Sequence, residues 1–364
     1  MSATSSEPSR VLIYRQGSLG DTLVALPCFH LIAKRFPQAE RRLLTNVPIS
    51  RHVAPSVEIL ESADLISGIF EYPIETRDPR QILQVVADIR AWRPDVVVYL
   101  VQARTRPKIA RDWLFLRMCG VRRIVGLSMN GDLIASRQMD GDLWESEASR
   151  LARNLHSLGE VDLDDDADWD LRLTHAERAG AAAALQPLAG CDGFVAFSLG
   201  TKWQPNEYGD GNWQTVLTTL AQAFPTLALV LIGAANEAER SERLVGAWRG
   251  RYVNLCGRLS PRESGAVLER ARLFLGHDSG PMHLAATVGT RCVAVFSSRG
   301  LPGVWFPRGR SHRVLYHRVS CMGCGLSECI TEAKRCIRAI EPATVSAECS
   351  RVLRELAQRR PAIA

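Results

Sequence analysis

Two glycine-bearing turns in this chain combine backbone geometry suited to anions with side chains suited to proton transfer. The first is Gly17-Ser18-Leu19-Gly20-Asp21, which follows the apolar run Val11 to Tyr14 and precedes an amphipathic stretch that begins at Thr22. A turn at a helix N-terminus exposes backbone N–H groups beside the positive end of the helix dipole. On local pattern alone, an ordinary helix cap is the simpler interpretation of Asp21, and a proton acceptor is the alternative.

The second turn lies in the run Asp278-Ser279-Gly280-Pro281-Met282-His283, which follows the apolar segment Leu273 to Gly276 and opens another helical stretch. Its acidic and hydroxyl residues can cap the helix, and Gly280 lets a ligand approach the backbone closely. His283 lies about one turn inside, within reach of a phosphate, although a buried structural histidine is the alternative. Two such turns at matching places in the two halves predict a cleft with an anion site on each wall.

Short apolar runs alternate with amphipathic segments along the whole chain, which is typical of parallel strands joined by crossover helices. The sequence therefore predicts an α/β fold. The predicted strands are Arg10–Arg15, Arg42–Val47, Leu65–Phe70, Asp95–Val101, Arg123–Leu127, Phe194–Ser198, Ala228–Ile232, Tyr252–Leu255, Leu273–Gly276 and Cys292–Phe296. Helices are predicted between them, including Thr22–Arg35, Arg80–Trp92 and Lys108–Cys119.

The length of the chain favours two domains, because 364 residues with 46% hydrophobic content can form two cores without disulfides. The acidic stretch Glu160–Asp170 has little to bury and is the best candidate for the connection. We therefore expect an N-terminal domain over residues 1–165 and a C-terminal domain over residues 166–364.

The charge and cysteine content exclude several classes of protein. A net charge of +6, carried mostly by arginine, suits phosphate-bearing ligands, and no basic stripe or finger pattern indicates nucleic-acid binding. The polar start Met1–Arg10 and the absence of a long apolar run predict neither an export signal nor a membrane span. Ten cysteines, several inside apolar segments, indicate reduced thiols and a cytosolic protein, with peripheral contact to an anionic membrane face left open.

Four cysteines near the C-terminus have a spacing that could enclose a metal. Cys321, Cys324, Cys329 and Cys336 fall within sixteen residues and could form a tetrahedral thiolate site for zinc or iron of structural function. The spacing matches no standard zinc ribbon or ferredoxin pattern, so reduced thiols in a compact loop are the alternative.

Several of these motifs resemble those of glycosyltransferase family 9, the bacterial heptosyltransferases. The resemblance rests on the two turns, on Ala25-Leu26-Pro27 after the first, on Gly289 after the second and on the run Val253–Ser260, and it covers nearly the whole chain. It implies a GT-B fold of two facing Rossmann-like domains. It also implies inverting sugar transfer without a catalytic metal, with the acceptor bound by the N-terminal domain and the nucleotide-sugar by the C-terminal domain.

The resemblance also implies functions for individual residues. Asp21 takes the place of the general base that removes a proton from the acceptor hydroxyl. Residues implied to contact the acceptor are Gly17, Ser18, Gly20 and Arg104. Residues implied to bind the donor are Lys202, Ser279, Gly280 and His283 at the phosphates, with Asp278 shaping their loop, Glu237 at the ribose and Leu259 at the base. Glu237 and Leu259 could equally be ordinary surface or core residues.

The implied reaction moves a heptose-type sugar from ADP-heptose, or a similar nucleotide-sugar, to a bacterial glycan or glycolipid such as the lipopolysaccharide core. No cofactor is implied for catalysis, while members that modify autotransporter proteins hold a metal through cysteines near this end. Three alternatives stay open: a related transferase with a protein or other acceptor and a different donor, a GT-B-fold sugar-nucleotide epimerase, and a non-catalytic nucleotide-sugar-binding relative. The sequence predicts no oligomeric state.

Overall fold

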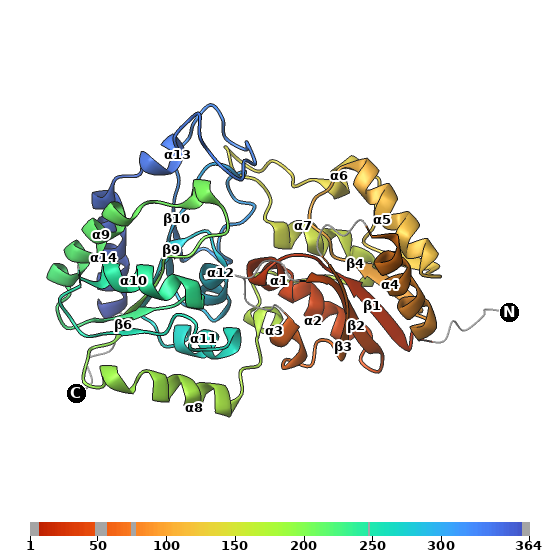
Figure 1. Ribbon diagram of the computed structural model, residues 1–364, viewed down its shortest axis with the longest axis horizontal. Coiled ribbons are helices and arrows are strands. Elements are labelled where there is room, and N and C mark those ends of the chain that lie inside the picture. Colours follow the sequence, from red (N-terminus) through yellow and green to blue (C-terminus); the bar gives the residue numbers. More distant parts are fainter. Residues whose placement is uncertain (1–6, 48–56, 74–77, 247, 359–364) are drawn as a thin grey trace. The chain divides into compact units, whose positions relative to one another are not determined.

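The computed structural model describes residues 7–47, 57–73, 78–246 and 248–358 (Figure 1). The first six residues, part of the polar N-terminus discussed above, lie outside this range. The chain divides into two compact units after Arg172. The acidic segment expected to connect them lies in the first unit, where Trp169 is buried. None of the helices in the described residues is long and apolar enough to span a membrane.

The first unit is built on a five-stranded parallel sheet with the order β3-β2-β1-β4-β5. The strands are β1 (Arg10–Tyr14), β2 (Glu40–Val47), β3 (Gly68–Pro73), β4 (Val96–Tyr99) and β5 (Arg123–Val125). All four residues of β4 are buried, as expected for a β-branched strand whose two faces are both covered by helices.

The helices of the first unit lie between these strands in sequence. They are α1 (Leu19–Val24), α2 (Leu26–Arg35), α3 (Val57–Glu61), α4 (Pro79–Trp92), α5 (Arg106–Met118), α6 (Gly131–Ile134) and α7 (Glu147–Asn154). The single helix predicted over Thr22–Arg35 is interrupted at Ala25, because Pro27 lies in the first turn of α2 and cannot continue the hydrogen-bond ladder of α1.

The second unit is built on a six-stranded parallel sheet with the order β11-β10-β9-β6-β7-β8. The strands are β6 (Phe194–Ser198), β7 (Ala228–Leu231), β8 (Tyr252–Asn254), β9 (Leu273–His277), β10 (Cys292–Val295) and β11 (Arg313–Leu315). The helices are α8 (His175–Ala184), α9 (Asp210–Ala223), α10 (Ala238–Val245), α11 (Pro261–Leu268), α12 (Gly280–Thr287), α13 (Arg335–Arg338) and α14 (Pro342–Gln358).

Both sheets confirm the α/β prediction. Every strand pairs in parallel with its neighbours, so the carboxyl ends within each sheet lie along one edge. The direction of winding reverses between β1 and β4 in the first sheet and between β6 and β9 in the second. Such switch points are where open α/β sheets bind ligands. The short, half-buried strand β11 was not predicted, because it lacks a continuous apolar run.

Candidate active site

The turn after β1 holds the Asp21 carboxylate in a fixed position. Asp21 is only 8% exposed, and its Oδ2 accepts hydrogen bonds from the backbone N–H of Ser18 at 2.6 Å and from the Ser18 hydroxyl at 2.8 Å. Gly17 has φ of 125°, and a Cβ at that position would lie 2.4 Å from Asp21 Cβ and Cγ. Ser18 is thus the N-cap of α1, and Asp21 closes a capping box at the third helical position.

Two further strand ends contribute to this turn. Gln102, in the loop after β4, donates its side-chain amide to Asp21 Oδ1. Asn46, near the end of β2, accepts a hydrogen bond from the backbone N–H of Gly17 at 3.2 Å. Gln102 and Asn46 were not among the predicted site residues, although each lies at the carboxyl end of a predicted strand. The carboxylate therefore lies at the switch point between β1 and β4, with one partner on each of its oxygens.

A group of buried charged side chains holds the backbone of the turn that carries Asp21. Arg15 and Arg150 are 1% and 2% exposed, and Glu147 lies between them, 3.7 Å from Arg15 and 2.7 Å from Arg150. Arg15 donates to the backbone carbonyl of Asp21 at 3.1 Å and to that of Leu100 at 2.6 Å. Burial lowers the pKa of Arg15, and the negative charges of Asp21 and Glu147 oppose this shift. Arg15 therefore joins the Asp21 turn to the loop after β4, and Arg150 donates to the Val101 carbonyl of that loop at 2.9 Å.

Arg104 is less available to an acceptor than its sequence position indicates. Its guanidinium forms a 2.6 Å ion pair with Asp112, which is 2% exposed and also accepts a hydrogen bond from the Tyr99 hydroxyl at 2.7 Å. Burial and the neighbouring Asp112 carboxylate raise the pKa of Tyr99, so the phenol stays protonated and donates this bond. Asp112 therefore holds the Arg104 guanidinium in place, although it shares its negative charge with Arg111 at 2.9 Å.

The residues predicted to bind a donor all follow strand ends of the second sheet. Lys202 follows β6, Glu237 follows β7, Leu259 follows β8, and the run Asp278 to His283 follows β9. Because these four strands are neighbours and parallel, the residues lie along one edge of the sheet. Lys202 and the run after β9 lie on either side of the switch point between β6 and β9.

The run after β9 forms the start of α12. His283 is 5% exposed, its Nε2 lies 3.8 Å from Asp278 Oδ1, and its ring centroid is 6.3 Å from that of Trp305. Ser279 is the N-cap of α12, but its side chain does not cap the helix as predicted. Its hydroxyl turns back to the carbonyl of His277 at 3.3 Å. The cap position therefore leaves the first N–H groups of α12 without a side-chain acceptor from Ser279.

Two glycines make room for the Glu237 carboxylate. A Cβ on Gly200 would lie 2.0 Å from Glu237 Oε1, and a Cβ on Gly233 would lie 2.1 Å from its Oε2. The same carboxylate accepts a hydrogen bond from the backbone N–H of Ala234 at 3.1 Å. Glu237 is therefore packed between the loops that follow β6 and β7, and any larger residue at either glycine would displace it.

Lys202 is exposed and stacks on an aromatic ring beside a second cation. Its Nζ lies 5.1 Å from the centroid of Trp203, and the guanidinium carbon of Arg299 lies 4.8 Å from the same ring. Arg299 follows β10 and also donates to the carbonyl of Leu326 at 2.8 Å. The Trp203 ring thus keeps two positive groups together near the β6 strand end, and Arg299 was not selected from the sequence.

His277, the last residue of β9, is a neutral structural histidine that was not among the predicted site residues. It is 1% exposed, its Nδ1 is 3.1 Å from the Leu199 carbonyl, and its Nε2 accepts from the Tyr208 backbone N–H at 3.0 Å and from the Trp213 indole at 3.2 Å. Burial lowers the pKa of His277 to about 3. Its position next to Asp278 is the signal by which the sequence could have indicated it. The hydrogen bond from its ring to the Leu199 carbonyl joins the ends of β6 and β9.

We expect this histidine to make the stability of the second unit pH-dependent. The unfolded chain binds a proton below about pH 6.5, whereas folded His277 does so only below about 3. Its contribution is therefore complete above pH 6.5 and falls by up to about 1.4 kcal/mol per pH unit as the pH drops from 6.5 toward 3. Urea unfolding at several pH values measures the free energy of unfolding as a function of pH. This free energy should change less with pH in His277→Gln than in the parent. Exposed His156→Gln is the matched control, and equal slopes for all three proteins would contradict the prediction.

The comparisons with known proteins identify the family of this chain. The family model described as glycosyltransferase family 9 (heptosyltransferase) matches residues 115–334. The chain belongs to glycosyltransferase family 9. The matched range contains every residue predicted to bind a donor, and it begins after the Asp21 turn.

A curated relative and two solved structures are similar to this family 9 chain. Lipooligosaccharide heptosyltransferase 2 of Campylobacter jejuni subsp. jejuni serotype O:2 is 24% identical over 130 residues, which is 34% of this chain and 41% of the relative. The match thus spans about two fifths of that relative's length. A family 9 structure from Veillonella parvula DSM 2008 has a TM-score of 0.70 at 16% identity, covering 95% of this chain and 98% of that one.

The second structure is E. coli heptosyltransferase WaaC with ADP-2-deoxy-2-fluoro heptose. It has a TM-score of 0.63 at 15% identity, and the match covers 94% of this chain and 99% of that chain. At these identities the likeness concerns the fold, and it confirms the GT-B fold class expected from the sequence.

The metal site predicted in this family 9 chain is not supported. No group of three or more His, Cys, Asp or Glu side chains is placed to hold a metal ion within residues 7–47, 57–73, 78–246 and 248–358. The proposed ligands were Cys321, Cys324, Cys329 and Cys336. All ten cysteines are free thiols, and Cys336 packs into the hydrophobic core while Cys324 is exposed. The four thiols therefore differ in solvent exposure, from buried Cys336 to exposed Cys324.

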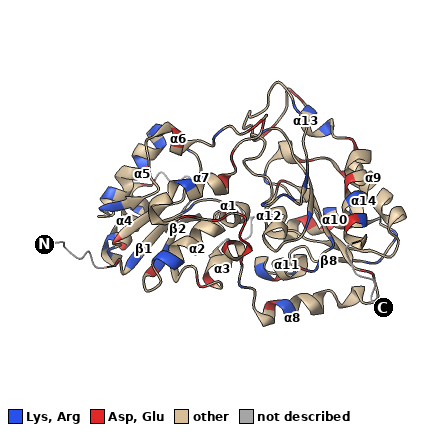
Figure 2. Cartoon of the chain, turned by 180° about the vertical axis from the view of Figure 1, so that it is seen from behind, with Lys and Arg blue, Asp and Glu red and all other residues tan. Residues whose placement is uncertain are grey.

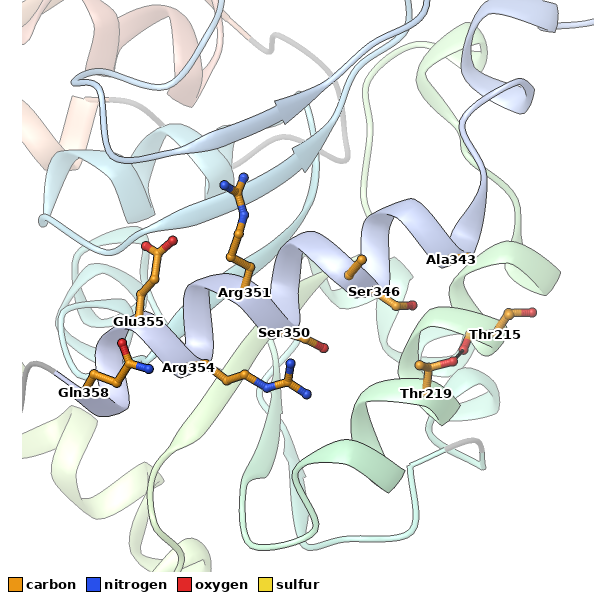
Figure 3. A pocket seen from close by; sticks show the side chains of 10 residues that line it. Thr215, Thr219, Ala343, Ser346, Ser350, Arg351, Arg354, Glu355 and Gln358 are labelled. Atoms are coloured by element: carbon orange, nitrogen blue, oxygen red, sulfur yellow. Dashed lines mark hydrogen bonds between the residues drawn. The ribbon is translucent and has the colours of Figure 1, made fainter.

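A surface pocket of the second unit lies between α9 and α14, and no predicted donor residue lines it (Figure 3). Thr215 and Thr219 donate their hydroxyls to carbonyls of their own helix, at 3.0 and 2.9 Å. Arg351 pairs with Glu348, and Glu355 pairs with Arg291 at 3.0 Å. The residues predicted to act in sugar transfer therefore lie outside this pocket.

Proposed function

We propose that this protein transfers a heptose-type sugar from ADP-heptose to a bacterial glycan acceptor of the lipopolysaccharide-core type, with inversion at the anomeric carbon. The observation that carries the proposal is the family 9 match over residues 115–334. Two similar proteins support the sugar and the acceptor class. One solved structure contains an ADP-heptose analogue, and the curated relative is named as a lipooligosaccharide heptosyltransferase.

In this proposal the first unit binds the acceptor and supplies the base. Asp21 takes the proton from the acceptor hydroxyl while that oxygen attacks the anomeric carbon. The capping box, Gln102 and the buried arginines support this function because they hold the carboxylate in one orientation. A fixed base lowers the entropic cost of reaching the reactive geometry.

The second unit binds the donor and stabilises its leaving group. Lys202, His283 and the N–H groups at the start of α12 are placed along one sheet edge, where they can contact a diphosphate whose negative charge grows as the glycosidic bond breaks. Glu237 would accept hydrogen bonds from ribose hydroxyls, and Leu259 would pack against the base. These side chains provide charge stabilisation that needs no metal ion, so we propose metal-independent catalysis.

We further propose that the protein acts in the cytosol and makes peripheral contact with a membrane. A glycan acceptor of the lipopolysaccharide-core type carries a lipid portion that resides in a bilayer. Contact with that bilayer would bring the first unit close to its acceptor.

Calorimetric titration with ADP, UDP and GDP tests the donor site. We expect the parent protein to prefer ADP, and Lys202→Ala and His283→Ala each to weaken ADP binding about tenfold, because a charge-assisted hydrogen bond contributes roughly 1.5–3 kcal/mol. Arg270→Ala is the matched control, since Arg270 is exposed and precedes β9, away from the carboxyl edge.

Each outcome of this titration has a distinct meaning. Preference for UDP or GDP would keep a family 9 transferase and discard ADP-heptose as the donor. Unchanged ADP affinity in His283→Ala would remove His283 from the phosphate site. Binding of none of the three nucleotides would contradict the proposed donor.

A further inference from the structure

Helix α5 of the first unit exposes a face that is both basic and apolar. Trp113, Leu114 and Met118 are 44%, 56% and 40% exposed. Six of the ten large apolar side chains that are exposed in the described residues lie between residues 113 and 143, on α5 and the segment after it. Scattered exposed apolar residues are ordinary, but a concentration in one region marks an interaction surface.

The cations around these apolar residues have no acidic partners in the described part of the chain. Arg106 and Lys108 are exposed at the start of α5, and Arg122 and Arg123 are exposed just after its end. None of the four takes part in an ion pair with a described residue. Asp112, the only acid on α5, is buried and paired with Arg104 and Arg111.

One cation of this region lies directly against an exposed aromatic ring. The guanidinium carbon of Arg117 lies 5.2 Å from the centroid of the Trp113 ring, and Arg117 also donates to the carbonyl of Arg122 at 2.9 Å. Lys and Arg positions recur along α5 (Figure 2). We name the set Arg106, Lys108, Trp113, Leu114, Arg122 and Arg123 the α5 face.

We infer that the α5 face docks this protein on a bilayer that contains anionic lipid. Lipid phosphates complement the unpaired cations, each of which contributes attraction near a charged surface, while Trp and Leu side chains insert at the level of the headgroups. α5 begins directly after the loop that carries Gln102 and Arg104, so the face starts at the sheet edge where Asp21 lies. This inference rests on the proposed function for its purpose, because a lipid-borne acceptor would reach Asp21 from that surface.

The test is co-sedimentation of the full-length protein with vesicles of phosphatidylcholine, alone or with one quarter phosphatidylglycerol. We expect binding only to the anionic vesicles, and release by high salt because the attraction is screened. Arg106→Glu/Lys108→Glu should lower the partition coefficient at least tenfold, and Trp113→Ser/Leu114→Ser should do the same without a change in charge. The assay uses neither donor nor acceptor, so its result is independent of sugar transfer.

The matched control reverses two exposed cations of the other unit. Arg249→Glu/Arg270→Glu changes the net charge by the same amount as Arg106→Glu/Lys108→Glu. We expect the vesicle binding of this control to stay within twofold of the parent. Circular dichroism melts and ADP titration check that every variant is folded. An equal loss of vesicle binding in this control and in Arg106→Glu/Lys108→Glu would overturn the inference. Failure of the parent to bind anionic vesicles would also overturn it. A parent dimer in sedimentation equilibrium that Trp113→Ser/Leu114→Ser dissociates would assign the face to a second copy of the chain instead.

Discussion

Asp21→Asn is expected to lower kcat for sugar transfer by roughly 10²–10⁴-fold, the range that a positioned general base contributes. Asparagine has nearly the same shape, and its carbonyl can still accept the hydrogen bonds from Ser18. The Gln102 amide can rotate to present its carbonyl to the new side-chain NH2, so the turn should be retained. The measurement is transfer from ADP-heptose to a core acceptor in a buffer with EDTA, where we expect the parent to remain active.

Two comparisons separate the loss of a base from a loss of structure. ADP affinity should be unchanged in Asp21→Asn, because the donor residues belong to the second unit. Asp88→Asn, which changes an exposed acid on α4 that bonds Gln84 at 2.8 Å, should transfer sugar at the parental rate. If Asp21→Asn kept more than about a tenth of the parental kcat, Asp21 would be a capping residue and the base would have to be another group.

Glu147→Ala is expected to destabilise the first unit by about 3–5 kcal/mol, since it leaves two arginines buried without their shared counterion. Arg15 and Arg150 would then repel each other, and burial already lowers the pKa of Arg15 in the intact protein. For a unit of this size the melting temperature should fall on the order of 10 °C. Scanning calorimetry or urea unfolding measures the change.

Asp132→Ala provides the control for the buried charge group. Asp132 pairs with Arg137 in the same unit, but both side chains are about half exposed, at 49% and 51%. Solvent screens an exposed pair of this kind, so Asp132→Ala should leave the melting temperature nearly unchanged. A loss below 1 kcal/mol in Glu147→Ala would show that the buried group does not stabilise the unit and would weaken its proposed support of Asp21.

The sequence predicted the strands well because each central strand is a continuous apolar run. Phe194–Ser198 was predicted with its observed bounds, whereas β3 begins three residues later than expected, since the half-buried β3 lacks a sharp apolar boundary. Proline explains the main error among the helices, where Pro27 separates α1 from α2. Local patterns thus predicted elements wherever burial was complete or backbone chemistry was decisive.

The candidate site was predictable only in part, because its supporting contacts are long-range. Asp21 and Gln102 are 81 residues apart in sequence, and the buried bond from Arg150 to the Val101 carbonyl spans 49 residues. No local pattern encodes such pairs. The four-cysteine motif shows the opposite problem, because its short spacing indicated a shared metal site, whereas the described residues form no group of metal-binding side chains there.

The strand order gives the two units a common plan. The order β2-β1-β4 in one sheet corresponds to β7-β6-β9 in the other, so the chain contains two copies of one scaffold without a repeated sequence. The loop of Asp21 then corresponds to the loop of Lys202, and the loop of Gln102 corresponds to the run that ends in His283. In the first unit these two loops bring the Gln102 amide to the Asp21 carboxylate, whereas in the second unit the corresponding loops carry Lys202 and His283. The strand order is thus shared by the two units, whereas the loops that follow the strands give each unit its own chemistry.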